Sequence, residues 1–235
     1  MSRVDFSSPT YPYERVQTGY NTMRGSEKIP KKLLNYLLDL PDKYGYEPRN
    51  DNARPRVRLI KYLWNDEPNP LFGPYPSTEE KLSLVFDGAH PVIDTEEMQR
   101  KHPKGYRIYP QKLWLPSQTK AQTILKCYIA RITHADEMHA SIGVAFEVWC
   151  NTNLINNTRT DDYERAYNIE QCIMEALHGV NIAGIGVVDC GRYTNLENGS
   201  QSIFDETGTN VGRRLHVSIS WAESESPASP EAAII

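Results

Sequence analysis

Residues 140–150 read ASIGVAFEVWC, in which apolar residues alternate with mostly small or polar ones. The apolar positions all fall on one face of an extended chain, as expected of a half-buried β-strand. Residues 124–132 are also rich in β-branched and aromatic side chains, but they are apolar on both faces apart from two basic residues. That pattern is typical of a more central strand. The short polar segment between the two predicts an antiparallel hairpin.

A helix is predicted after this hairpin. Thr160 can cap its N-terminus, and the two acidic residues that follow would interact favourably with the exposed N–H groups of the first turn. Gly179 supplies a common C-terminal stop. Helical spacing places four apolar residues on one face, which should lie on the sheet: Ala166, Ile169, Ile173 and Leu177.

Two further strands are predicted, at residues 180–189 and 215–221. Between them, residues 190–214 are dominated by Gly, Asn, Thr and Ser. Long loops inside compact domains are usually functional or flexible, because their backbone polar groups cannot be buried unpaired. We therefore expect a protruding hairpin arm there. The fold class that follows is α+β, with a mainly antiparallel sheet and one packed helix in the order β-β-α-β-β.

The N-terminal half has a different organisation. Residues 1–28 lack periodicity and should form an extended arm. Residues 29–118 should form a helical and proline-rich extended region, with helices at 29–40, from Pro55 through Trp64, and after Ser77, which stands at capping-box spacing from Glu80. The sheet domain would then occupy residues 119–222. Residues 223–235 are rich in acids, Ser and Pro and should be a disordered tail.

Composition limits the class of protein. The chain has 235 residues, of which 39% are hydrophobic and 24% charged, values that are ordinary for a globular protein. No apolar run approaches the roughly 20 residues that span a bilayer, and the N-terminus lacks the apolar core of a signal peptide. The four cysteines are spread singly and should be buried free thiols. We expect no membrane association.

Charge is segregated along the sequence. Residues 100–131 hold eight Lys or Arg and no acid, whereas residues 135–175 hold eight acids and two Arg. Such asymmetry suggests complementary surfaces between copies, or a basic face toward nucleic acid on which Tyr106, Tyr109 and Trp114 could stack bases. The alternative is that strand pairing mixes these charges in the folded protein.

The candidates for chemistry are weak. His134, Asp136, Glu137 and His139 are dense enough for a metal site, but their spacing differs from H-E-x-x-H and they fall on a predicted turn, where polar residues are common. A small hydrolase using His134, Glu137 and Cys190 remains an alternative without a supporting motif. We expect no catalytic residue, no cofactor and no metal site, and the protein is predicted not to be an enzyme.

Basic residues flank the long segment 190–214. Arg192 stands at one of its ends and Arg213 and Arg214 at the other, where they could bind phosphate or a neighbour's carboxylates bidentately, or simply keep a hairpin soluble. The candidate residues of a subunit or partner interface are Tyr106, Arg107, Trp114, Arg192, Arg213 and Arg214.

The order of elements resembles a known family. The predicted helix ends in ALHG at residues 176–179, the returning segment 182–188 reads IAGIGVV, and the closing strand 216–221 reads HVSISW. This arrangement is similar to the small α+β domain of tail terminator, tail completion and neck proteins of tailed bacteriophages. In that family such domains form rings, commonly hexameric, that cap the tail tube and present a docking surface to the head.

The resemblance implies a virion structural protein at the head–tail junction, assembled in the host cytoplasm. Its partners would be further copies in a homo-oligomeric ring and the neighbouring tail and head-connector proteins, with DNA passing through the channel. The sheet edge and residues 190–214 would meet neighbouring subunits, since ring closure pairs each exposed edge with the next copy. A nucleic-acid-binding protein that uses the basic aromatic stretch 100–131 is the alternative.

Overall fold

The fold is taken from a computed structural model, which describes residues 25–38, 54–67, 69–88, 95–112, 121–134, 139–155, 164–191 and 199–222. The predicted tail at 223–235 and nearly all of the predicted arm at 1–28 lie outside these ranges. The last residues of that arm form a single turn, η1 (Ser26–Lys28), which leads directly into the first helix.

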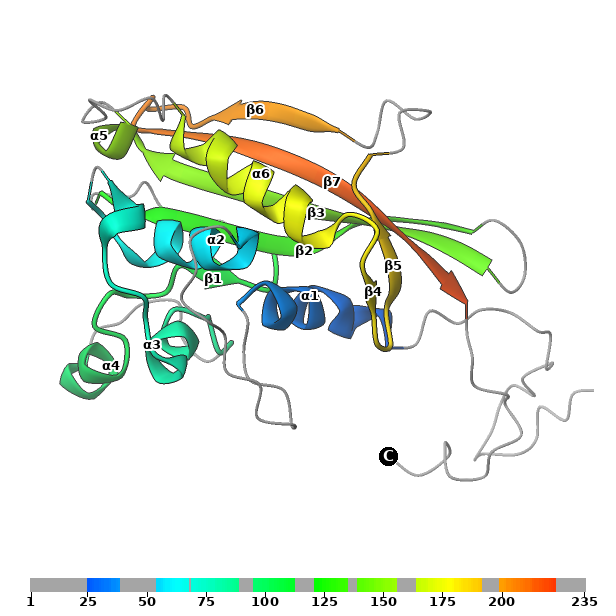
Figure 1. The fold of residues 1–235 in the computed structure, drawn as a ribbon, viewed down its shortest axis with the longest axis horizontal. Coiled ribbons are helices and arrows are strands. Elements are labelled where there is room, and N and C mark those ends of the chain that lie inside the picture. The colour runs from blue at the N-terminus through cyan, green and yellow to red at the C-terminus, as the bar shows by residue number, and fades with distance from the viewer. Residues whose placement is uncertain are drawn as a thin grey trace, which may run out of the picture.

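A seven-stranded, mainly antiparallel sheet organises the protein (Figure 1). Of the described strand pairs, β1 with β2 is parallel and the others are antiparallel. β6 lies off the main strand order and pairs with the first part of β7, whereas β5 pairs with the last part of β7. The main order is β1 (Ile108–Tyr109), β2 (Thr123–His134), β3 (His139–Asn151), β7 (Asn210–Ala222), β5 (Gly186–Asp189), β4 (Asn181–Ile182), with β6 at Ser200–Phe204.

The β2–β3 hairpin confirms the alternation read from the sequence. Every second residue of β3 from Ile142 to Cys150 is fully or almost fully buried on the core face. The strand register shifts once, between Ile129 and Arg131, where β2 carries an irregularity. Beyond that point residues 130–134 of β2 are all exposed, and in Figure 1 the ends of β2, β3 and β7 extend past the helices.

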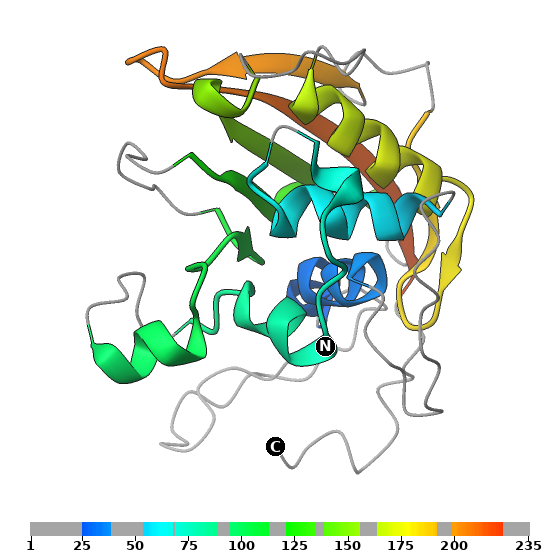
Figure 2. The same ribbon diagram turned by 60° about the vertical axis from the view of Figure 1, so that its left-hand side comes forward.

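Three helices cover one face of the sheet, where a single packed helix was predicted. They are α1 (Ile29–Leu37), α2 (Pro55–Trp64) and α6 (Arg165–Leu177), and both views show them side by side on that face (Figures 1 and 2). The apolar stripe expected on α6 is buried as predicted. Apolar residues of all three helices and of the sheet form one core, which crosses the boundary expected at residue 119.

The shorter helices lie around this core. α3 (Thr78–Ser83) has the predicted capping box: the Glu80 N–H donates to Ser77 Oγ at 3.2 Å, and the Ser77 N–H donates to Glu80 Oε2 at 2.7 Å. α4 (Glu96–Lys101) falls where an extended segment was expected, and α5 (Thr152–Ile155) and η2 (Pro70–Phe72) are single turns.

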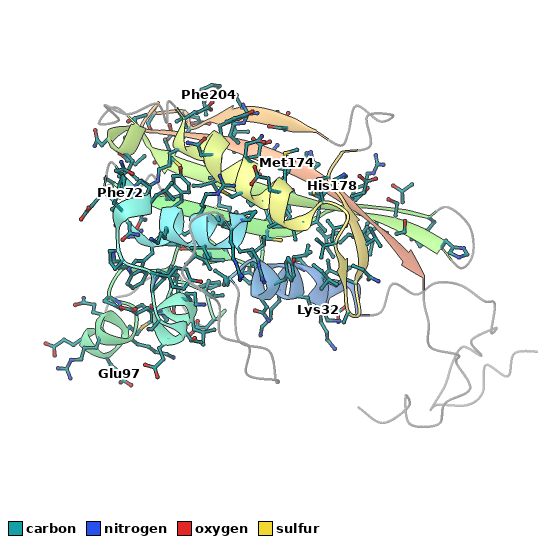
Figure 3. All side chains as sticks on the ribbon, in the orientation of Figure 1. Lys32, Phe72, Glu97, Met174, His178 and Phe204 are labelled. Atoms are coloured by element: carbon teal, nitrogen blue, oxygen red, sulfur yellow. The ribbon has the colours of Figure 1, made fainter. Side chains whose placement is uncertain are left out.

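Three local predictions were wrong. α6 begins at Arg165, with Glu164 before it in an extended conformation, and not after Thr160. Residues 180–189 form a hairpin of two short strands, β4 and β5, because Gly184 adopts a left-handed conformation (φ 71°) that reverses the chain. This hairpin is held to α1 by Lys32, whose Nζ donates to the Gly184 carbonyl at 3.0 Å (Figure 3).

The third correction concerns residues 190–214, which were expected to form a long loop. Residues 200–204 are β6 and residues 210–214 are the first part of β7. The strand β6 was missed because its sequence lacks the apolar alternation of a core strand. On the helix side of the sheet, Ser200 and Ser202 of β6 accept hydrogen bonds from Arg213 of β7, so these positions are polar. A hairpin exists here, as expected, but it forms the margin of the sheet.

Candidate functional site: a groove at the edge of the sheet

An open groove of about 520 Å³ lies where β2 meets the chain that follows β1 and the start of α1. We call it the edge groove. Its apolar wall is formed by Pro30, Pro110, Ile129 and Ala130. Its polar lining is Glu27, Gln111, Lys112, Tyr128, Arg214 and His216.

The groove exists because β1 covers only a short part of the β2 edge. β1 pairs with Leu125 and Lys126 and is followed by Pro110, which has no N–H to continue a ladder. The Leu125 N–H donates outward to the Arg107 carbonyl at 2.8 Å. Since backbone groups alternate in direction along a strand, those of Cys127 and Ile129 also point outward. Among the described residues no strand pairs with this part of β2.

A buried carboxylate lies beside the groove. Glu147, on β3, is 3% exposed and accepts hydrogen bonds from Tyr128 Oη at 2.6 Å, Arg214 Nε at 2.8 Å and Trp149 Nε1 at 3.4 Å. Burial by itself would raise the pKa of Glu147, but the hydrogen bonds from Tyr128 and Arg214 outweigh it and hold the pKa below its ordinary value. Glu147 is therefore ionised at neutral pH.

Two cations flank this carboxylate, and a third lies over the neighbouring Tyr128 ring. Lys126 and Arg214 flank Glu147 in the strand register, and the Lys126 Nζ lies 5.7 Å from the centroid of the Trp149 ring. Lys112 lies with its Nζ 5.5 Å from the centroid of the Tyr128 ring. Burial lowers the pKa of Lys126. The negative charge of Glu147 raises this pKa, and the positive charges of Lys112 and Arg214 lower it further.

His216, the fourth basic side chain, lines the groove next to Arg214. Burial and then the charge of Arg214 lower the pKa of His216, so this imidazole is neutral at pH 7. The groove thus combines an excess of positive charge, an apolar wall and outward-pointing backbone groups. In chemical terms, this arrangement can bind an extended segment that carries a carboxylate or another anion.

Two of the predicted interface residues, Tyr106 and Arg107, are inside the protein. The Tyr106 ring packs edge-on against Phe86 with the ring centroids 5.2 Å apart, and its hydroxyl donates to Asp87 Oδ1 at 3.3 Å. Arg107 is 3% exposed and donates to both carboxylate oxygens of Asp66 at 2.6 Å. Their burial argues against direct contact with a partner.

The basic stretch instead serves the C-terminal end of α2. Arg107 Nη1 donates to the Leu63 carbonyl at 2.9 Å, and Lys104 Nζ donates to the Trp64 carbonyl at 2.7 Å. From α6, Arg165 donates to the carbonyl of Tyr62 at 2.6 Å and to that of Asn65. The last carbonyls of a helix have no partner within the helix and carry partial negative charge, so cations are favourable there. In the strand register, Lys126 of the basic stretch lies opposite Glu147 of the acidic stretch, so strand pairing brings these two opposite charges together.

Consecutive arginines on β7 point to opposite faces of the sheet. Arg213 lies on the helix side, where its Nε donates to Glu170 Oε2 at 2.6 Å, and its guanidinium lies 5.4 Å from the centroid of the Tyr167 ring. Arg214 lies at the edge groove and pairs with Glu147. Of the six predicted interface residues only Arg214 belongs to the candidate site, and Trp114 and Arg192 lie outside the described residues.

The residues considered for catalysis are not brought together. His134 and His139 are exposed where the β2–β3 hairpin ends, while Asp136 and Glu137 lie outside the described ranges. Within the part of the chain that the structure describes, no group of three His, Cys, Asp or Glu could hold a metal ion. Burial, and secondarily Asp189, raises the pKa of Cys190 to about 12, so the thiol is protonated and poorly suited to act as a nucleophile.

Sequence reasoning missed most of the groove. Alternation places Glu147 and Trp149 on the face of their strand opposite its core residues, but nothing local indicates that Tyr128 and Arg214 converge on Glu147. Lys112 enters the site only through the parallel pairing of β1. A charged residue in the middle of an otherwise apolar strand was the one available signal.

The YomW family model matches residues 57–215, from α2 into β7. The chain belongs to the YomW family. The family carries a phage-derived name, and the protein is therefore phage-associated. No curated protein and no solved structure matches the chain. Among the described helices of this YomW-family protein, none is long and apolar enough to cross a bilayer.

Proposed function

We propose that this protein is a structural component of the phage virion at the head–tail junction: a tail terminator, tail completion or neck protein. It assembles as a homo-oligomeric ring that joins the tail tube to the head, with neighbouring tail and head-connector proteins above and below and DNA passing through its channel. Its role is assembly rather than catalysis. Membership of a phage-associated family and the α+β sheet support this proposal.

The observation that carries the proposal is the exposed outer edge of β6, at the margin of the sheet (Figure 1). The Asp205 N–H donates to the Asn210 carbonyl at 3.2 Å, which places the odd-numbered residues of β6 in hydrogen-bonded pairs with β7. The backbone groups of Ser200, Ser202 and Phe204 therefore point away from the sheet. In the described part of the chain no strand covers them.

This edge also carries exposed apolar surface. The Phe204 side chain is 70% exposed and stands at the margin of the molecule beside β6 (Figure 3). A free strand edge is a ready template for another chain, and in a closed ring every copy satisfies the edge of the next. The apolar ring of Phe204 would be covered in the same contact, since exposed aromatic residues are typical anchors of interfaces.

One substitution tests the edge without breaking the hairpin. Ser202→Pro removes an outward N–H that β7 does not use, whereas Ser202→Ala removes only the hydroxyl that accepts from Arg213 Nη1. We expect the wild-type chain to reach about six times its mass of 26.8 kDa by light scattering and to form closed rings in negative stain. Ser202→Ala should keep this mass and Ser202→Pro should lose it. Equal assembly of both variants would show that the β6 edge is not the contact.

The nucleic-acid alternative has lost its main support. Tyr106 and Tyr109 are buried, and Arg107 is neutralised by Asp66. Fluorescence anisotropy with single- and double-stranded DNA at two salt concentrations checks it directly, because binding through phosphates weakens steeply with salt. We expect no specific binding to the stretch 100–131.

A further inference from the structure

We propose that the edge groove is the receptor for the acidic segment 223–235 of a neighbouring copy, which adds to the part of the β2 edge that no described strand covers and places a carboxylate beside Lys112. The inference rests on the proposed function, because it requires copies to stand side by side. It assigns a partner to the groove, on the side of the sheet opposite β6.

The first argument is charge. Lys126 and Arg214 flank Glu147 in the strand register, and Lys112 lies over the ring of Tyr128, whose hydroxyl donates to Glu147. Glu147 already has three donors. The cluster therefore keeps an excess of positive charge that an added carboxylate would balance. Lys112 is the exposed member and faces the groove. Glu27 also lines the groove and would repel an acid, so the incoming carboxylate is expected beside Lys112.

The second argument is the form of the groove. It follows the β2 edge at Ile129, whose N–H and C=O point outward. An extended segment could form ladder hydrogen bonds there, as in recognition by strand addition. The adjacent wall of Pro30, Pro110 and Ala130 is apolar and would accept aliphatic side chains. The groove thus selects an extended segment with an acid followed by apolar residues.

Residues 223–235, which read ESESPASPEAAII, have this composition. The segment carries Glu223, Glu225 and Glu231 and no basic residue, and Glu231 is followed by four apolar residues. Its two prolines lie before Glu231, so the last five residues keep the N–H groups that strand addition needs. Fully extended, residues 223–231 span about 30 Å at about 3.3 Å per residue, which lets Glu231 reach well beyond the end of β7.

The direct test is zero-length carbodiimide cross-linking of the full chain. Equal amounts of ¹⁵N-labelled and unlabelled protein are mixed, cross-linked and digested, and the linked peptides are identified by mass. We expect an amide between Lys112 and Glu231, with Glu225 as a minor partner, in peptides that join labelled to unlabelled chains. Links found only within one chain would overturn the assignment to a neighbour.

Binding is measured separately with a fluorescent peptide of residues 222–235 and the full chain carrying Glu231→Gln, which weakens competition from its own segment. Lys112→Gln should weaken peptide binding about tenfold, as expected for the loss of one charge-assisted contact. Lys101→Gln, at an exposed lysine on α4, is the matched control and should change the affinity less than twofold. Circular dichroism confirms that both variants are folded.

The outcomes separate this inference from the proposed function. Rings without any link to Lys112, or equal peptide binding by Lys112→Gln and the control, would overturn the inference and leave the ring intact. Binding of an oligonucleotide that depends on Lys112, with no peptide binding, would assign the groove to phosphates and overturn it as well. Links between chains in a species that never closes into rings would support the groove and count against the junction role.

Discussion

Replacing Arg165 tests how α6 is held to the end of α2. This side chain extends from the start of α6 to the end of α2 and is 3% exposed. It donates to the carbonyls of Tyr62 at 2.6 Å, Asn65, and Glu67 at 3.1 Å. Arg165→Met keeps most of the aliphatic volume and removes every donor. The carbonyls at the end of α2 then lose their partner from α6.

The magnitude follows from these contacts. A hydrogen bond from a charged donor contributes about 1.5–3 kcal/mol, and a buried acceptor left unpaired costs about 1–3 kcal/mol. The variant also avoids the desolvation of a guanidinium, which offsets part of the loss. We expect Arg165→Met to lower the free energy of unfolding by about 3 kcal/mol, or the melting temperature by about 6–12 °C for a chain of this size.

Arg58→Met is the matched control. Arg58 on α2 pairs with Glu175 on α6, between the same two helices, but their side chains are 31% and 49% exposed. Exposed ion pairs contribute about 0–1 kcal/mol. Urea unfolding of both variants, followed by circular dichroism at one protein concentration, gives the comparison. If Arg165→Met cost no more than Arg58→Met, the helix-end carbonyls would not depend on Arg165 and the reasoning would be refuted.

Three further predictions concern the sheet. The pKa of Glu147 is lower in the folded protein than its ordinary value of about 4.5, so the ionised carboxylate stabilises the fold above that pH. This contribution is lost as the pH falls through the lower, folded pKa. In Glu147→Gln, the urea midpoint should therefore fall less steeply at acid pH than in the wild type. A Cβ at Gly212 would lie 2.2 Å from a carbonyl oxygen of β3, whereas one at Gly143 would have no neighbour closer than 3.6 Å. In thermal melts, Gly212→Ala should lower the free energy of unfolding by about 3 kcal/mol, and Gly143→Ala by under about 0.5 kcal/mol. Burial raises the pKa of the Cys127 thiol well above its ordinary value and that of Cys190 to about 12. A thiol reagent should therefore label these two cysteines only as fast as the protein unfolds. Rapid labelling in native buffer would contradict their burial.

Local patterns were sufficient where one face of an element meets the core. The alternation of β3, the stripe of α6 and the capping box of α3 were each readable because burial and capping impose a fixed spacing. β6 failed this test. Its residues Ser200 and Ser202 are polar because they face Arg213, a long-range neighbour that no local window contains.

The candidate site was less predictable than the fold. Arg107 was proposed as an interface residue from the charge of its segment, yet it neutralises Asp66 inside the protein. A count of charge along a sequence cannot show which carboxylates or carbonyls lie opposite in space. Lys112 and Glu147 become neighbours of one site only through strand pairing, so the edge groove could not have been assembled from local patterns.

The central position of β7 has a consequence for how the chain acquires its structure during synthesis. β7 lies between β3 and β5 and also carries β6, and it is the last strand of the described sequence. While the ribosome is still translating, α1, α2 and the β2–β3 hairpin can form, but their shared apolar face cannot close until residues 210–222 have emerged. The sheet can therefore be completed only after β7 has been synthesised. Because β7 pairs with strands that are distant in the sequence, folding is expected to be slow. Incomplete chains would expose the edge of β3 and the apolar face beneath the helices, which favours aggregation.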